Sequence, residues 1–396
     1  MSRLSAGANT TYVVGALLVL FVIKFLFLSH IPAPTDSASD SSSSGSSLRS
    51  PDLHTFRHPP GQATSGDLPG YDPSLQSHPI RDKFDSFAEY KYREVCKISS
   101  LELHRPFEPL CADKKSLLTA MSSGGRIGID APYMPRDCDM RWYTTEEACS
   151  ILERFDRVAV IGDSMMRQML GALYVLLRKD MGYGGVTGWN FNDQEKADCF
   201  CNAQNNVKSC SVQTIYSSND IMKWDPNSFA CDASKVNIFI SLQVRFPQED
   251  EELERFANDL DGVPINKKVA FVFGQGLWND LDVQAALNYL DRSASAIKRK
   301  LPDYDADTNT YPRLFVTPNA AGPRKQDAFI LTQGNKPLML FENSMYSVLP
   351  PKGFDVLGTW NMSIQSTSYD GVHCDLKANL IKAMMILNWL DRAGSE

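Results

Sequence analysis

The stretch RVAVIGDSMMR, residues 157–167, decides the fold of this chain. Its branched apolar residues suffice for one buried strand, and residues 168–177 then repeat apolar side chains at helical spacing. Ser164 is therefore expected at a strand-to-helix turn, with its hydroxyl at the carboxyl edge of a sheet. Backbone N–H groups at such a turn favour negative charge, which suits an acyl-transfer nucleophile. The alternative is that Gly-Asp-Ser only ends a strand and caps a helix.

A second motif lies near the other end of the chain. The segment SYDGVHC, residues 368–374, precedes an amphipathic stretch from Leu376 to Leu390, so Asp370 and His373 fall on the loop that enters this helix. A serine nucleophile needs a base, and the base needs an orienting carboxylate. One loop can deliver both, because the two residues are three apart. The alternative is an ordinary turn Asp and a surface His. We predict that Ser164, His373 and Asp370 are catalytic.

Together the two motifs resemble those of the SGNH (GDSL-type) hydrolase superfamily. More narrowly, GDSMMR at residues 162–167 resembles the Gly-Asp-Ser-x-x-Arg of its PC-esterase branch, which includes trichome-birefringence-like and fungal polysaccharide O-acetyltransferases. PRDCDMRW, residues 135–142, is similar to the Cys-containing segment ahead of the Gly-Asp-Ser strand in that branch. The resemblance covers roughly residues 130–396 and implies an SGNH-like parallel sheet flanked by helices. The second Gly of the Gly-x-Ser-x-Gly elbow of α/β-hydrolases is missing.

The resemblance also directs attention to GQGLWND, residues 274–280, which follows a strand-like run. The superfamily has Gly-x-Asn-Asp here, and its Asn donates to the oxyanion, whereas Gly276 and Asn279 are three apart in this chain. The PC-esterase branch tends toward Gly-His-Trp-Trp, with which this chain agrees only at Gly276 and Trp278. We predict that Gly276 and Asn279 serve the oxyanion or the substrate. Gln275 is an alternative donor, and capping the next helix is an alternative role for Asn279.

Two further side chains are predicted to contact substrate. Arg167 lies one helical turn beyond Ser164, where the family pattern implies substrate contact or support of the serine loop; otherwise it is a solvated helix residue. Trp278 can stack on a sugar ring, or can be a buried core residue. The superfamily takes a second oxyanion donor from a glycine after the first helix. Spacing does not choose among the four glycines there, which are Gly182, Gly184, Gly185 and Gly188.

Strand-like and helical runs alternate along the globular part, which predicts an α/β fold with ligands at the carboxyl ends of its strands. The expected strands are 158–161, 211–217, 236–244, 269–273 and 314–317. The expected helices are 165–177, 251–260, 283–301, 337–348 and 376–390.

The N-terminal part differs in composition from the rest of the 396 residues. Residues 12–28 are apolar apart from Lys24, which predicts a membrane-spanning signal anchor; a cleaved signal peptide is disfavoured by the poor cleavage site at residues 31–34. Residues 31–80 are rich in Ser and Pro and are expected to form a disordered stem. The predicted organisation is thus a tail and transmembrane anchor over residues 1–30, a stem over 31–80, and an SGNH-like catalytic domain over 81–396.

Nine cysteines allow two interpretations: a disulfide framework, or a zinc site built on Cys199-Phe200-Cys201. Disulfides are favoured because the cysteines are widely spread, so no metal site is predicted; at least one Cys must stay free or pair between chains. Disulfides imply that the globular part of the chain, residues 81–396, lies in an oxidising lumen. We therefore expect a single-pass type II membrane protein of the Golgi or another secretory-pathway membrane.

The net charge of −7 and the absence of a basic tract argue against nucleic acid as a partner, and are compatible with a glycan. The sequence therefore predicts a polysaccharide or glycan O-acetyltransferase that forms an acyl-Ser164 intermediate. The alternatives are a carbohydrate acetylesterase and a non-catalytic glycan-binding protein. No bound cofactor is expected, and an acetyl donor, with acetyl-CoA as a candidate, is the co-substrate.

Overall fold

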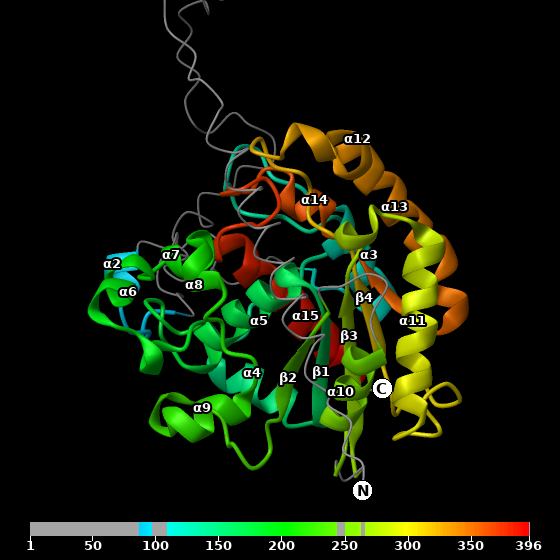
Figure 1. The fold of residues 1–396 in the computed structure, drawn as a ribbon, viewed down its shortest axis with the longest axis horizontal. Helices are drawn as coiled ribbons and strands as arrows, with labels where there is room; N and C mark the ends of the chain where they lie inside the picture. The colour runs from blue at the N-terminus through cyan, green and yellow to red at the C-terminus, as the bar shows by residue number, and fades with distance from the viewer. Residues whose placement is uncertain (1–86, 97–108, 244–249, 263–265, 396) are drawn as a thin grey trace, which may run out of the picture. The chain divides into compact units, whose positions relative to one another are not determined.

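The computed structural model describes residues 87–96, 109–243, 250–262 and 266–395 (Figure 1). All of these belong to the second of the two units into which the chain divides, Asp72–Glu396. The predicted tail, membrane span and stem, residues 1–80, lie outside the described residues. Within the described ranges, no helix is both long enough and apolar enough to cross a bilayer.

Five parallel strands form the central sheet, in the order β2-β1-β3-β4-β5. Their sequences are largely continuous apolar runs because helices cover both faces of the sheet. The chain leaves β1 for β2 on one side and returns to β3 on the other, which opens a crevice at the carboxyl ends of β1 and β3. The strands are β1 Phe155–Gly162, β2 Ile238–Leu242, β3 Lys268–Gly274, β4 Arg313–Val316 and β5 Asp355–Leu357.

Alternate strand residues face two separate hydrophobic cores, as the two-residue period of a strand requires. Val158 and Val160 of β1 face one core, against α3 (Lys114–Ser123), α4 (Thr145–Leu152), α5 (Ser164–Leu177) and α15 (Leu376–Ser395). Ala159 and Ile161 face the other core, against α10 (Asp250–Asp259), α11 (Val283–Lys298) and α13 (Asn335–Val348). Figure 1 shows α5 and α15 on one side of the sheet and α11 on the other. The predicted α/β class, a parallel sheet flanked by helices, is confirmed.

Four of the five predicted strands match β1 to β4, whereas the one at 211–217 is wrong. Ser211 ends α8 (Lys208–Ser211), and the Thr214 hydroxyl donates to the Ser211 carbonyl at 2.8 Å, so the segment turns back on itself. Among the described residues, the strand-type pairing of this segment is limited to isolated bridges at Thr214 and Ser217. The remaining short helices are α2 Arg93–Cys96, α6 Asp193–Asp198, α7 Ala203–Asn206, α9 Ser218–Trp224, α12 Ile330–Gln333 and α14 Trp360–Ser363.

Four disulfides crosslink the body, which confirms the predicted framework. They join Cys96 to Cys201, Cys111 to Cys138, Cys149 to Cys231, and Cys199 to Cys210. The zinc alternative on Cys199 and Cys201 is therefore wrong, because both sulfurs are already paired. Cys374, the remaining cysteine, is free and buried, and burial raises the pKa of its thiol to about 12.

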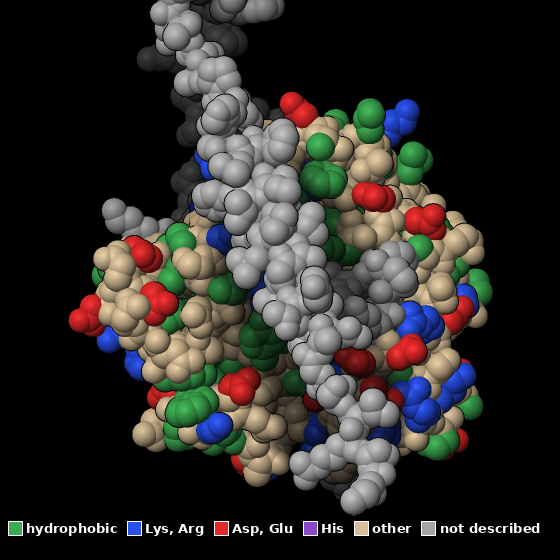
Figure 2. Space-filling view, viewed as in Figure 1, with side chains coloured by type: hydrophobic (Ala, Val, Ile, Leu, Met, Phe, Trp, Pro, Cys, Tyr) green, Lys and Arg blue, Asp and Glu red, His purple; other side chains and the backbone are tan. Residues whose placement is uncertain are grey.

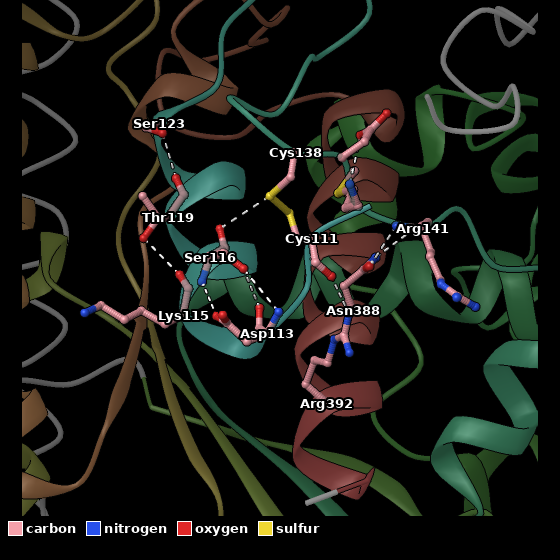
Figure 3. Close-up of a disulfide and its surroundings, with 12 residues drawn as sticks. Cys111, Asp113, Lys115, Ser116, Thr119, Ser123, Cys138, Arg141, Asn388 and Arg392 are labelled. Carbon is pink, nitrogen blue, oxygen red and sulfur yellow. Dashed lines mark hydrogen bonds between the residues drawn. A yellow bond between two sulfur atoms is a disulfide. The ribbon is translucent and has the colours of Figure 1, made fainter. Parts of the chain in front are cut away.

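The Cys111–Cys138 disulfide lies beside the last helix, α15 (Figure 3). The Asn388 side chain accepts from the Arg141 N–H at 2.9 Å and donates to the Arg141 carbonyl at 2.7 Å. Arg392 donates to the Cys111 carbonyl at 2.6 Å. The segment before β1 is therefore held against the helix that follows the Asp-x-x-His loop.

Ion pairs link the outer helices α10 and α11. Arg292 pairs with Asp250 at 2.8 Å and Arg299 with Glu254 at 2.7 Å. On the face shown in Figure 2, basic and acidic side chains are interleaved over these helices. Exposed pairs of this kind each contribute little to stability, so the two cores carry the fold.

Candidate active site

The turn between β1 and α5 is tight because two strands and a helix meet there. Gly162 pairs with Gly274 at the ends of β1 and β3. A Cβ on Gly162 would overlap the Gly274 carbonyl oxygen, and a Cβ on Gly274 would overlap the Met166 side chain. The glycine of Gly-Asp-Ser is thus required by close approach, and it lets α5 begin directly at the edge of the sheet.

Asp163 caps α5 and is fully buried behind the serine. Its carboxylate accepts from the Met165 N–H at 2.9 Å. Burial raises the pKa of Asp163, while the Met165 hydrogen bond and the nearby charges of His373 and Lys382 act in the opposite direction. The capping interpretation therefore holds for Asp163. It does not account for Ser164, the first residue of α5, whose side chain lines a cavity.

The loop before α15 brings Asp370 and His373 to Ser164. The Ser164 Oγ lies 2.6 Å from His373 Nε2, across 209 residues of sequence, and His373 Nδ1 lies 2.7 Å from Asp370 Oδ2. The other Asp370 oxygen, Oδ1, accepts from the backbone N–H groups of Val372 at 2.9 Å and of His373 at 2.8 Å. The three residues predicted from the two motifs are thus in one hydrogen-bonded chain.

The charge on Asp370 determines which atom donates in each hydrogen bond between Ser164, His373 and Asp370. Burial raises the pKa of Asp370, but the hydrogen bonds from the His373 ring and from the backbone outweigh it and bring the pKa to about 2. The carboxylate is therefore ionised and accepts a hydrogen bond from the Nδ1–H group, and in this tautomer Nε2 is the acceptor for the Ser164 hydroxyl. The Tyr369 ring stacks on His373, with centroids 5.5 Å apart, and holds the imidazole plane.

Gly371, inside the Asp-x-x-His motif, locks this loop against the one after β4. Its φ of 82° is in the left-handed region, and a Cβ there would overlap the backbone N of Lys325. The Gly322 N–H donates to the Gly371 carbonyl at 3.0 Å. The position of His373 therefore depends on a backbone contact that only glycine allows.

A cavity of about 380 Å³ opens above Ser164 and His373. It lies at the carboxyl ends of β1 and β3, where the strand order predicts a ligand crevice. Its apolar rim is formed by Leu277, Trp278, Phe329 and Val372, and its polar wall by Asp280, Lys325, Gln326 and Gln333. The candidate nucleophile is thus open to a ligand with both apolar and polar parts.

Among the predicted substrate residues, only Trp278 lines this cavity; its side chain is 57% exposed at the rim. Gly276 forms a turn with φ 150°, and the Leu281 N–H donates to its carbonyl at 2.9 Å. The Asn279 amide donates to the Asp282 carbonyl at 3.2 Å, and Asp282, not Asn279, caps α11. Arg167 is half-buried outside the cavity lining, and its buried Nε has no partner among the described residues.

The four glycines considered as second oxyanion donors already use their N–H groups inside the protein. Gly185 donates to Gln204 Oε1 at 2.8 Å, and Gly182 to Asp180 Oδ1 at 2.9 Å. Gly184 and Gly188 donate to backbone carbonyls. By contrast, the Ser164 N–H at the start of α5 has no intrahelical acceptor, as at any helix N-terminus, and can face an oxyanion.

No protein-family model, curated protein or solved structure matches this chain. In the part of the chain that the structure describes, no group of three or more His, Cys, Asp or Glu side chains is placed to hold a metal ion. The interpretation of the site therefore rests on its own geometry. Sequence reasoning did not assign the polar wall, because its residues come from separate segments that share no single motif. It also gave no role to Tyr369, which directly precedes Asp370 in the second motif.

Proposed function

We propose that this protein is a serine acyltransferase of the SGNH type, similar to the PC-esterase branch, that acts on O-acetyl groups of a polysaccharide or glycan. The observation that carries the proposal is the hydrogen-bonded chain from Ser164 through His373 to Asp370 at an open cavity. A serine, a base and an orienting carboxylate in this order are the components of nucleophilic acyl transfer.

In the proposed reaction, Ser164 Oγ attacks the acetyl carbonyl while His373 Nε2 takes its proton. The oxyanion of the tetrahedral intermediate faces the Ser164 N–H at the positive end of α5. Collapse of the intermediate breaks the bond to the leaving group, which receives the proton from His373. A sugar hydroxyl then gives its proton to His373 and attacks the carbonyl of acyl-Ser164. Collapse of this second intermediate breaks the bond to Ser164 Oγ, which takes the proton back from His373 and becomes a free hydroxyl again. Asp370 holds the imidazole in the required tautomer throughout.

The cavity rim supports a carbohydrate acceptor. The exposed Trp278 ring and the neighbouring Phe329 ring offer apolar faces beside Ser164, and sugar rings bind to such faces through their C–H groups. The polar wall of the same cavity offers hydrogen-bonding groups for hydroxyls. An acetylesterase would use the same intermediate with water as the acceptor, and a non-catalytic glycan-binding protein would have no need of the ordered Ser164–His373–Asp370 chain.

The disulfides support an oxidising compartment for the described residues. Together with the apolar run at residues 12–28, they support our proposal of a single-pass type II protein of a Golgi or other secretory-pathway membrane. In this arrangement the candidate site faces the lumen, where glycans are modified.

The acceptor decides whether the protein is a transferase or an esterase. The full-length chain in detergent, given an activated acetyl ester, should hydrolyse it slowly, and the right oligosaccharide should divert acetyl to sugar and speed donor consumption. A sugar held in attack geometry outcompetes water because effective molarities of about 10⁵ M or more become available. Mass spectrometry of the oligosaccharides measures the transfer. Rapid deacetylation of acetylated glycans, with no acetyl transfer to a broad acceptor panel, would replace this proposal with the esterase.

Replacing Gly371 by alanine should lower kcat for an activated acetyl ester by about 10²-fold, because the added Cβ moves the loop that places His373. The matched control is Gly262→Ala: Gly262 also has a positive φ, 69°, but a Cβ there meets open space. Both variants should be compared by turnover and by thermal unfolding. Equal activities of the two variants would show that the Gly371 contact does not position the base.

A further inference from the structure

A buried cation forms part of the cavity wall beside the proposed nucleophile. Lys325 lies on the loop after β4, and this loop is held in place by its backbone contact with Gly371. Lys325 is only 8% exposed, yet it lines the same cavity as Ser164 and His373. The ammonium is therefore shielded from bulk water but open to a ligand in the cavity.

The ammonium has one neutral hydrogen-bond partner. Lys325 Nζ donates to Gln333 Oε1 at 2.7 Å. The Gln333 amide donates in turn to Asp280 Oδ1 at 2.8 Å and to the Leu277 carbonyl at 2.9 Å. Gln333 thus stands between the ammonium and the carboxylate of Asp280. Throughout the described ranges, no carboxylate lies within ion-pair distance of Lys325.

Burying this ammonium costs free energy unless a ligand supplies a negative charge and further hydrogen-bond acceptors. An ammonium has three N–H donors, and burial without a counter-ion carries a desolvation penalty. The Gln333 amide and the Phe329 ring, whose centroid lies 5.6 Å from Lys325 Nζ, offset this penalty only in part. Burial lowers the pKa of Lys325, while the negative charges of Asp370 and Asp280 act against that shift. Asp370 is engaged by His373 and Asp280 by Gln333. Neither carboxylate neutralises the ammonium by direct contact.

We propose that Lys325 binds an anionic group of the substrate, a carboxylate or a phosphate, while the ester carbonyl lies at Ser164. The inference rests on the proposed function and adds a substrate class to it. A carboxylate would belong to an acidic sugar, and a phosphate to the acyl donor. Either anion would accept a charge-assisted hydrogen bond from Lys325 Nζ and supply the missing counter-charge. Such bonds are strongest inside a partly dehydrated cavity.

The test is calorimetric binding to the full-length chain in detergent, so that it does not depend on turnover. The probes are methyl glucuronide, methyl glucoside and inorganic phosphate; the two sugars differ only by a carboxylate in place of a hydroxymethyl group. We expect wild type to bind the glucuronide or phosphate, or both, more tightly than the glucoside. Lys325→Met should weaken binding of the anion about 10- to 100-fold, and Lys325→Arg should retain most of it. Lys298→Met, which removes an exposed lysine paired with Asp305, is the control.

Each result of this experiment either supports or overturns the anion subsite at Lys325. Preference for the glucuronide assigns the anion to the sugar, and preference for phosphate assigns it to the donor. Equal binding of the two sugars, together with phosphate binding that is absent or unchanged in Lys325→Met, would overturn the subsite. A purely structural lysine would instead lower the thermal unfolding temperature on replacement and leave the preference intact. Anion binding without acylation of Ser164 would refute the proposed function and keep the subsite; acylation without anion preference would do the reverse.

Discussion

Replacing Ser164 by alanine should lower kcat for activated acetyl esters by about 10⁴-fold or more, the scale of loss when a triad enzyme loses its nucleophile. The reason is geometric: the Ser164 hydroxyl is the one that lies 2.6 Å from His373 Nε2 in the cavity. Alanine removes the attacking oxygen and changes little else, since Asp163 still caps α5. Steady-state turnover of 4-nitrophenyl acetate measures the loss.

The matched control for this variant is Ser347→Ala. The Ser347 hydroxyl lies on the exposed side of α13 and donates to the Asn343 carbonyl, so its removal should leave turnover at the wild-type level. Thermal unfolding of both variants separates a loss of catalysis from a loss of folding. Wild-type activity in a folded Ser164→Ala protein would show that another group is the nucleophile.

Replacing Asp370 by asparagine should lower kcat by about 10³- to 10⁴-fold while the loop stays folded. The asparagine oxygen can still accept from the Val372 and His373 N–H groups. Its NH₂ group would then face His373 Nδ1, which favours the tautomer with the proton on Nε2, so that the ring no longer accepts from Ser164. The exposed carboxylate of Asp291 on α11 provides the control, Asp291→Asn. Near-normal turnover of Asp370→Asn would remove the carboxylate from the proposed mechanism.

The Asp370→Asn variant should also differ from wild type in how its free energy of unfolding changes at acid pH. The folded-state pKa of Asp370, about 2, is below the usual unfolded value of about 3.9, so the unfolded chain binds the proton first. The stability that this carboxylate contributes is therefore present above about pH 4 and is lost as the pH falls toward 2. Urea unfolding at several pH values should show a shallower acid-side decline for Asp370→Asn than for wild type. Identical declines would mean that the carboxylate is not held as its hydrogen bonds indicate.

The sequence predicted the centre of the fold because that part depends on local patterns. It predicted the three residues of the site because each of the two motifs that supply them is local. The apolar run of β1 and the helical spacing of α5 place Ser164 at the sheet edge, and Asp370 and His373 share one short loop. The strand β5 was not predicted, because its three residues, Asp355–Leu357, are too few to show a pattern. The strand predicted at 211–217 is wrong because the alternation there belongs to a turn beside the Cys199–Cys210 disulfide.

Other features depend on contacts between distant segments, which no local pattern encodes. The disulfide partners Cys96 and Cys201 are 105 residues apart, and nine cysteines allow many pairings. Lys325 lies in the loop after β4, Gln333 ends the short helix α12, and Asp280 lies in the loop after β3. Only the folded chain brings these three into one wall. The contact of the Asn279 amide was also not encoded by a local pattern. The family resemblance suggested a role at the oxyanion, whereas in the structure this amide donates to the Asp282 carbonyl in its own loop.

The most direct measurement is peptide mass spectrometry of the full-length protein after brief exposure to an activated acetyl ester. The proposed mechanism predicts an acetyl group on Ser164, because His373 activates that hydroxyl at the open end of the cavity. The label should be absent from Ser164→Ala and should leave the wild-type protein when an acceptor sugar is added. An active enzyme that never carries acetyl on Ser164, or an acetyl found on another residue and released at the rate of turnover, would contradict the assignment of Ser164 as the nucleophile.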